Sequence, residues 1–331
     1  MRNYHIDVAK GIGIILVIAG HLFTYKSVIS MMIFSFHMPV FFFLSGMLYR
    51  KNEYSVFLFL KEKFKKLWYP FFLVMLLGFL ISLLLPSWRE SLTLNSILSD
   101  LYKAQPEKFH VGQIWFLACL FHVEFFYHVM YWKLLRKISC ASVIIIFIII
   151  SVMGKEVVNV NSFFPYHRLP IKIDSAIMGM FFYGIGHYYM QFMYTQKLFN
   201  DKCVFALLGL ICSPLNGWSN LADVSYNSFI LYFLFSLSGI FFVLWLARKL
   251  QHVKFLQFIG KNSLEIFTMH SFLISLWCEG LSNLLEYNIV NGKNMPPLYS
   301  VIGTIIILFV FCFEISIRNN IVFKGHNEKR L

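Results

Sequence analysis

Long apolar runs constrain the fold of this chain more than any other feature of its sequence. Residues 71–85, 143–153, 229–247 and 301–313 are almost entirely apolar, and apolar and polar residues do not alternate within them. In lipid, each backbone N–H and C=O group must be bonded within the protein, which only helices and closed barrels achieve. Barrel strands show a two-residue alternation that these runs lack. The sequence therefore predicts an all-α, polytopic integral membrane protein.

Charged residues make up only 14% of the chain, whereas a soluble domain contains about a quarter. This low share excludes a soluble globular enzyme. In a soluble protein, the net charge of +13 would suggest a nucleic-acid partner. In a membrane protein the same charge sets the orientation in the bilayer. We therefore expect the lipid bilayer as a partner and no nucleic acid.

Ten apolar segments bounded by charged residues or proline are candidate membrane spans. They cover residues 8–25, 31–49, 67–85, 111–132, 138–153, 173–195, 203–214, 228–247, 263–285 and 298–316. The fifth and seventh are shorter than the roughly 20 residues that a spanning helix needs. If the N-terminus is cytoplasmic, most of the 29 Lys and Arg residues fall in cytoplasmic loops, as the positive-inside rule requires. The working topology is ten spans with both termini cytoplasmic.

The polar connections between these spans are short. The longest, residues 86–110 and 154–172, are too short to fold alone. The sequence also shows no repeat of fixed period. We therefore expect the whole chain, residues 1–331, to form a single integral membrane domain.

The first predicted span carries a pattern of ionisable residues. Lys10 and His21 are eleven residues apart, so they share one face of a helix and lie about 16 Å apart along its axis. Ile14 and Val17 lie between them on the same stripe, along which a thin, extended molecule could bind. Alternatively, Asp7 and Lys10 pair near the headgroups and His21 is a hydrogen-bonded interior histidine. Spacing alone leaves both interpretations open.

A second histidine, His37, opens the second predicted span and is separated from His21 by only 15 residues. The two imidazoles therefore lie at similar depth on antiparallel neighbours. Two imidazoles in an enclosed site can divide acid and base roles or bind a metal. No third ligand at coordinating spacing is visible in the sequence, so we expect no metal.

Two stretches of the sequence resemble a known family. Residues 4–21 and 35–46 are similar to the opening of the membrane acyltransferase-3 family, particularly its fucose 4-O-acetylase-like branch. The family signature is a basic residue, ten positions and a histidine, and Lys10 and His21 match it. Weaker similarities follow along almost the whole chain, at residues 114–117, 170–186 and 259–270.

This resemblance implies a fold and an activity. Family members have about ten membrane helices and transfer acyl groups, usually acetyl from cytoplasmic acetyl-CoA, to hydroxyls of surface glycans or their polyprenyl-linked precursors. The same function is implied here, as an O-acetyltransferase of the bacterial inner membrane. The thin molecule along the first helix would then be the pantetheine arm. Lys10 would meet a phosphate of the cofactor, and His21 would lie by the thioester.

Acyl transfer needs a base for the attacking hydroxyl and donors for the developing oxyanion. His21 suits the first task, and an acyl-histidine intermediate is also chemically possible. His37, Ser45 or the indole N–H of Trp115 could supply the second. We assign His21 and His37 to catalysis, Ser45 with Lys10 to the donor, and Trp115 to the acceptor.

Three further residues are candidates for contact with the acceptor. Arg168 and Asp174 flank the sixth predicted span on its outer side, where sugar hydroxyls would bind, although a local ion pair would explain them equally well. His270 lies on the ninth predicted span, whose ionisable residues suggest that it faces an interior cavity. A structural role for His270 is the alternative.

Two other classes of function remain open. A transporter, such as a flippase for a lipid-linked glycan or a small solute, would also need many spans with interior charges. Transporters built from repeats show paired broken helices in two related halves, which this sequence lacks. A structural subunit of a glycan assembly complex would leave the aligned Lys10 and His21 unexplained.

Overall fold

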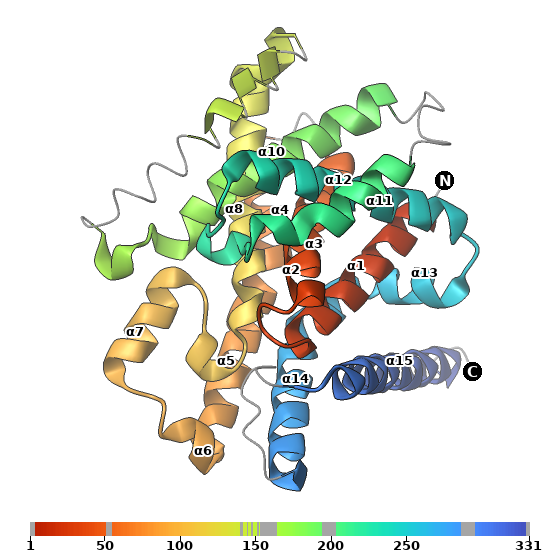
Figure 1. The fold of residues 1–331 in the computed structure, drawn as a ribbon. Coiled ribbons are helices and arrows are strands. Elements are labelled where there is room, and N and C mark those ends of the chain that lie inside the picture. Colours follow the sequence, from red (N-terminus) through yellow and green to blue (C-terminus); the bar gives the residue numbers. More distant parts are fainter. Residues whose placement is uncertain are drawn as a thin grey trace.

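The computed structural model describes residues 4–50, 55–139, 142–143, 145–146, 148–150, 152, 164–193, 203–285 and 295–328. Within these ranges the regular secondary structure is helical (Figure 1), with one isolated antiparallel bridge between Asn220 and Ser225. The predicted all-α class is therefore confirmed for the described part of the chain.

Among the described residues, eight longer helices and six shorter ones carry the architecture. The longer helices are α1 (Tyr4–Leu22), α3 (His37–Met47), α5 (Tyr69–Leu84), α8 (Trp115–Lys133), α10 (Ile173–Tyr188), α12 (Phe229–Lys249), α14 (Ser263–Leu285) and α15 (Pro297–Glu328). The shorter helices are α2 (Val28–Phe34), α4 (Val56–Lys63), α6 (Pro86–Arg89), α7 (Leu94–Lys103), α11 (Cys203–Cys212) and α13 (Lys254–Lys261).

Six helical stretches of the described chain are long and apolar enough to cross a membrane. They are Tyr4–Leu22, Val28–Met47, Val56–Leu84, Gly112–Lys137, Phe229–Lys249 and Pro297–Asn319. They coincide with the first four, the eighth and the tenth predicted spans. α10, α11 and α14 overlap the sixth, seventh and ninth, whereas most of the fifth, 138–153, lies outside the described residues. The chain is therefore a multi-pass membrane protein, and the total of ten spans with cytoplasmic termini stays a prediction.

α1 lies in the middle of the bundle, where it contacts α3, α12, α13, α14 and α15 (Figure 1). Glycines bring its closest neighbours into backbone contact, because a Cβ at Gly260 of α13 would clash with the carbonyl of Asp7. α3 and α10 meet in the same way, since a Cβ at Gly46 or Gly186 would clash with backbone of the opposite helix. Small residues allow this close approach in membrane bundles. The packing fixes α1 and α3 rigidly at the centre.

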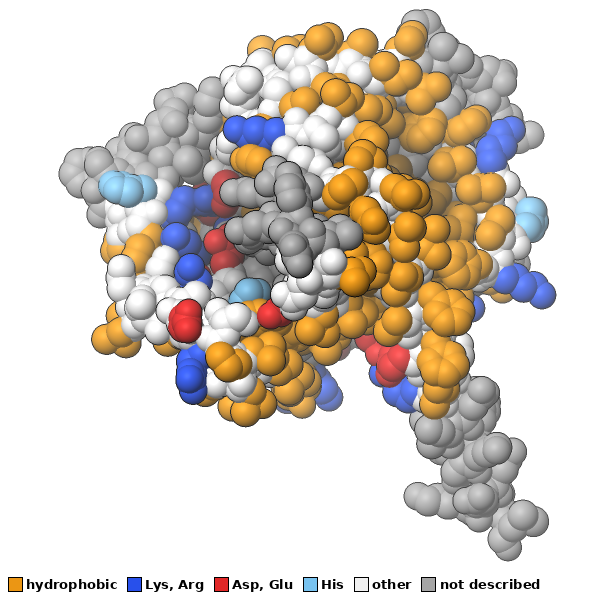
Figure 2. All heavy atoms as spheres, turned by 60° about the horizontal axis from the view of Figure 1, so that its bottom comes forward, with side chains coloured by type: hydrophobic (Ala, Val, Ile, Leu, Met, Phe, Trp, Pro, Cys, Tyr) orange, Lys and Arg blue, Asp and Glu red, His pale blue; other side chains and the backbone are white. Residues whose placement is uncertain are grey.

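The outer helices present apolar side chains to their surroundings. Leu80 of α5, Leu234 of α12, and Ile305 and Phe309 of α15 are exposed. Figure 2 shows hydrophobic side chains gathered over one broad part of the face that it presents. Exposed apolar area of this extent is expected where a protein contacts lipid.

Candidate active site

The two ends of α1 open into two different cavities. Lys10 lines a cavity of about 710 Å³, which we call the basic cavity. His21 lines a second cavity of about 540 Å³, which we call the histidine cavity. Phe267 of α14 lines both cavities and therefore lies in the partition between them.

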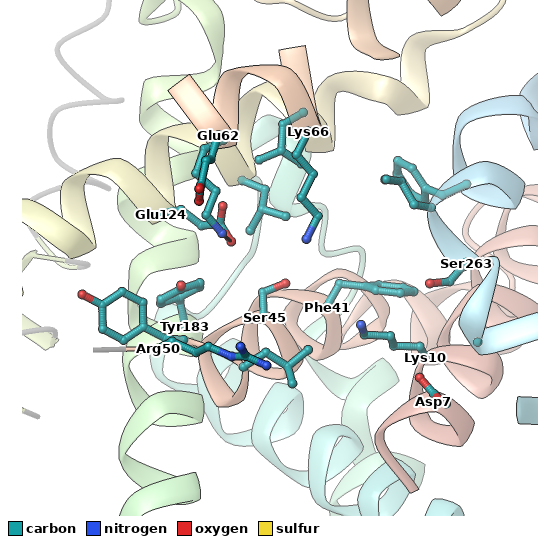
Figure 3. Close-up of a pocket in the computed structure, with 18 of the residues that line it drawn as sticks. Asp7, Lys10, Phe41, Ser45, Arg50, Glu62, Lys66, Glu124, Tyr183 and Ser263 are labelled. Carbon is teal, nitrogen blue, oxygen red and sulfur yellow. Dashed lines mark hydrogen bonds and ion pairs between the residues drawn. The ribbon is translucent and has the colours of Figure 1, made fainter. Parts of the chain in front are cut away.

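The basic cavity takes its name from its charged lining. Five basic residues line it against three acidic ones: Lys10, Arg50, Lys63, Lys66 and Lys261, with Asp7, Glu62 and Glu124. One pair is an ion pair, in which Lys63 Nζ lies 2.9 Å from Glu124 Oε1. Figure 3 shows Lys10, Arg50 and Lys66 extending from different segments around the space beside Ser45. The structure thus places both residues predicted to bind the donor, Lys10 and Ser45, in one cavity with a net positive charge.

The histidine cavity brings His21 of α1 together with His37 of α3. The ring of Phe34 contacts both, with centroids 5.6 Å from His21 and 4.7 Å from His37. His270 of α14 also packs against His21, at a centroid distance of 5.8 Å. Imidazoles from three helices, one of them more than two hundred residues away in the sequence, therefore meet at one place.

Hydrogen bonds define what two of these histidines can do. His37 Nδ1 lies 2.9 Å from the carbonyl oxygen of Ile33, and His270 Nδ1 lies 2.6 Å from that of Phe267. A carbonyl oxygen only accepts, so each Nδ1 carries the hydrogen and each neutral ring keeps a lone pair at Nε2. Nε2 of neutral His37 can therefore accept a proton. It cannot donate a hydrogen bond to an oxyanion, which is one of the roles that the sequence suggests for His37. His270 Nε2 is buried and has no hydrogen-bond partner among the described residues.

Three histidines so close together raise the question of a metal. Within the described residues, no group of three or more His, Cys, Asp or Glu side chains is arranged to hold a metal ion. We assign no metal to this cavity.

Trp115 begins α8 and lines the histidine cavity, with a buried lysine behind it. Lys172 Nζ lies 5.5 Å from the centroid of the Trp115 ring, bonds to the side-chain oxygen of Gln105 and donates to the carbonyl of Ala222 at 2.8 Å. Burial, followed by the nearby Arg168 guanidinium, lowers the pKa of Lys172 to about 8. A cation over an indole face is a stabilising contact that polarises the ring.

In the sequence, Lys172 lies directly before the sixth predicted span, and nothing there marks it as buried. The direction of the Lys172 side chain follows from the local backbone conformation. Ile171 and Lys172 have φ values of 47° and 62°, which non-glycine residues seldom adopt. Strained backbone of this kind is found where a side chain must be held in an unusual place. Here it turns the Lys172 side chain inward, where it is only 2% exposed.

Arg168 and Asp174 form an ion pair, with Arg168 Nε 2.5 Å from Asp174 Oδ2. Arg168 also donates to the carbonyl of Ala222 at 2.9 Å and lies 3.4 Å from Asp223 Oδ1. Ala222 and Asp223 line the histidine cavity, whereas Arg168 and Asp174 are not among its lining residues. The pair therefore fixes a wall of the cavity, and its predicted contact with a sugar stays a prediction.

An aromatic cluster that the sequence did not reveal lies at the histidine cavity. The Trp218 ring lies 4.5 Å from the Tyr25 ring and 4.5 Å from the Phe34 ring, and all three residues line the cavity. In the sequence, Trp218 lies just after the seventh predicted span, where aromatic residues commonly mark the membrane interface. Its contact with Phe34 of α2 brings it to the site. Neutral polar side chains complete the lining, among them Gln105, Gln113, Asn220 and Ser275.

Comparison with known proteins gives one match. The family profile described as an acyltransferase domain, acyltransferase-3, matches residues 3–313. No curated protein and no solved structure matches the chain significantly. The profile covers nearly the whole chain, including both cavities and the helices that build them. The chain therefore belongs to the acyltransferase-3 family of membrane acyltransferases.

Proposed function

We propose that this protein transfers an acetyl group from acetyl-CoA to a sugar hydroxyl of a surface polysaccharide or its polyprenyl-linked precursor. One observation carries the proposal. A single helix, α1, presents Lys10 to a basic cavity and His21 to a cavity with further histidines, and Phe267 lies between the two. This arrangement suits a reaction whose two substrates differ in charge and approach from different sides.

The basic cavity suits the donor. Coenzyme A carries several phosphate charges, and basic side chains bind phosphate through charge-assisted hydrogen bonds. Lys10, Arg50, Lys66 and Lys261 line one cavity from four segments of the chain. Its volume of about 710 Å³ is within the range of small-molecule sites. In the proposed orientation this cavity opens to the cytoplasm of a bacterial inner membrane, where acetyl-CoA is available.

The histidine cavity suits the acceptor. A sugar ring combines hydroxyls, which need hydrogen-bond partners, with apolar C–H faces that stack on aromatic rings. The lining of this cavity offers both, with Gln105, Gln113 and Asn220 as polar groups and Trp218 as an aromatic face. The histidine cavity has few charged residues, so it does not favour an anionic ligand, whereas the basic cavity does.

The chemistry follows from the positions of the side chains. His21 takes the proton of the acceptor hydroxyl as its oxygen attacks the thioester carbonyl and forms the new C–O bond. Trp115, in the same cavity, has an indole N–H that can donate to the oxyanion. The C–S bond then breaks, and the proton held by His21 passes to the departing thiolate. His37, with its Nε2 lone pair, is the second candidate base.

The deciding experiment uses purified protein in lipid nanodiscs with radiolabelled acetyl-CoA and a glycan acceptor. We expect acetyl transfer that depends on both substrates, together with slow hydrolysis when the acceptor is omitted. An acyl-histidine route would instead leave label on the protein after acid quenching. Protein that binds the glycan but never consumes acetyl-CoA would contradict the proposal and support a transporter, which family membership does not favour.

A further inference from the structure

Three phenylalanines from three helices pack against one another at the boundary of the two cavities. Phe267 of α14 has its ring centroid 5.3 Å from Phe116 of α8 and 6.4 Å from Phe41 of α3, and the last two lie 6.0 Å apart. Each is at most 9% exposed. Phe41 lines the basic cavity and Phe267 lines both cavities, so these two rings form the partition, and Phe116 packs against them without lining either cavity.

This partition also covers the stripe of α1 between Lys10 and His21. The ring of Phe41 lies so close to Gly13 that a Cβ there would be 2.9 Å from its Cζ. Ile14 and Val17, the residues expected to line an extended ligand, are 0% and 1% exposed. The two ends of the stripe are therefore open and its middle is filled with side chains. A cofactor arm that enters beside Lys10 reaches the aromatic cluster before it reaches His21.

The partition is attached directly to the histidines. The carbonyl of Phe267 accepts the hydrogen bond from His270 Nδ1 at 2.6 Å, and the His270 ring packs against His21. The ring of Phe267 thus lies between the donor cavity and the place where the thioester carbon must react. Whatever group the donor carries has to fit beside this ring.

We propose that Phe267, together with Phe41, sets the size of the acyl group that the enzyme accepts and restricts it to acetyl. The proposal rests on the proposed function, because it takes an acyl-CoA as the donor. Phe41 and Phe267 are both buried, so an acyl group that passes them has to displace a ring, and each further methylene increases that displacement. A hydrophobic pocket typically discriminates one methylene by about 10-fold to 200-fold.

Phe116 supplies a matched control. It is the same residue type, it is equally buried, and its ring contacts both Phe41 and Phe267. However, Phe116 is not among the residues that line either cavity. A general loss of packing would affect the Phe116 and Phe267 variants alike, whereas acyl selection would be affected only by Phe267.

The test compares kcat/KM for acetyl-CoA, propanoyl-CoA and butanoyl-CoA in the wild type, Phe267→Ala and Phe116→Ala, with one acceptor. We expect the wild type to prefer acetyl over propanoyl by about 10-fold or more. Phe267→Ala should lower the preference for acetyl over butanoyl by at least about 10-fold. Phe116→Ala should keep the wild-type preference. If Phe267→Ala does not fold, Phe267→Leu against Phe116→Leu makes the same comparison.

Two results would overturn the inference while leaving the proposed function intact. One is a wild type that uses butanoyl-CoA as well as acetyl-CoA. The other is an equal change of acyl preference in folded Phe267 and Phe116 variants. A wild type that transfers no acyl group from any of the three donors would instead contradict the proposed function, and the inference with it.

Discussion

The two cavities share helix α1 but differ in the charge of their linings. The basic cavity has five Lys or Arg residues against three Asp or Glu residues. Among the described residues, the charged lining of the histidine cavity consists of Lys108, Glu107 and Asp223. The rest of that lining is aromatic, neutral polar or imidazole, apart from Met38, Ala222 and two glycines. Ligands bind best where their charge complements the lining of the site. The basic cavity therefore favours an anionic ligand, and the histidine cavity favours an uncharged polar ligand.

The comparison also shows what the partition does for specificity. Under the proposed function, phosphates attracted by Lys10 and its basic neighbours would be held away from His21, because Phe267 lies between the two cavities. Binding and chemistry should therefore respond to different substitutions. Four experiments test this separation.

The largest expected effect concerns His21. If His21 is the general base, His21→Ala should lower acetyl transfer per folded enzyme by about 10²-fold to 10⁴-fold, the usual contribution of a positioned base. Acetyl-CoA affinity should hardly change, because His21 lies on the far side of the partition. Transfer rate and CoA binding are measured on the same folded preparation, with His21→Gln and His37→Ala in parallel. Normal turnover in folded His21→Ala would move the base to His37.

The second experiment addresses the basic cavity. Lys10→Ala should weaken acetyl-CoA binding by roughly 10-fold to 100-fold, since a hydrogen bond to a charged group contributes about 1.5–3 kcal/mol. Lys10→Arg should keep most of the affinity, because the role needs a positive charge. Lys65→Ala is the control, since Lys65 is exposed and is not among the lining residues. Equal CoA affinity in wild type and Lys10→Ala would remove Lys10 from the donor site.

The third experiment addresses the aromatic face of the histidine cavity. Trp218→Ala should raise the KM for the glycan acceptor by about 10-fold, because an aromatic contact is worth about 0.5–1.5 kcal/mol beyond its area. The KM for acetyl-CoA should stay the same. Trp245→Ala is the control, since Trp245 of α12 is not among the residues lining either cavity. A rise in both KM values would mean that the two sites are not separate.

The smallest expected effect is a pH dependence from Lys172. Since the pKa of Lys172 is lowered to about 8, its charge beside Trp115 is lost as the pH rises through 8. The transfer rate should fall by about 2-fold to 10-fold over that range, the worth of a cation–π contact. The charged and titratable neighbours are Arg168, Asp174, Asp223 and Cys119.

Stability should change in the opposite direction. Between pH 8 and the ordinary lysine pKa of about 10.4, the unfolded chain binds more protons than the folded one, so the free energy of unfolding rises with pH. A fall in activity there cannot be attributed to unfolding. Lys172→Met should show the low rate at all pH values and no decline through pH 8. A decline that persists in Lys172→Met would assign the titration to another group.

Much of the fold was predictable because apolar runs and charged loops report directly on the bilayer. Spans such as α5 and α12 follow from hydropathy alone, since their side chains face lipid. α10 is harder to recognise, because it lies inside the bundle and carries the buried Asp174 and several glycines. Its environment is protein, so its sequence need not be uniformly apolar.

The candidate site was predictable only along a single helix. The eleven-residue spacing places Lys10 and His21 on α1, and both residues line cavities. The separation of these cavities depends on Phe267, which is more than two hundred residues away and looks like any other apolar residue of a span. Lys172 was assigned to an outer loop because its inward direction depends on backbone conformation. Contacts between distant segments carry no local signal, so neither feature could be predicted.

The filled partition has a consequence for energetics in a cell. Moving one elementary charge across a membrane potential of 100 mV involves about 2.3 kcal/mol, and an open pore beside the basic cavity would also let ions through. An acetyl group is uncharged, so its passage between the packed rings involves no electrical work. The phosphates of coenzyme A would stay on their own side. Under the proposed function, the rate of acetyl delivery would be independent of the membrane potential. The delivery would also leave that potential unchanged.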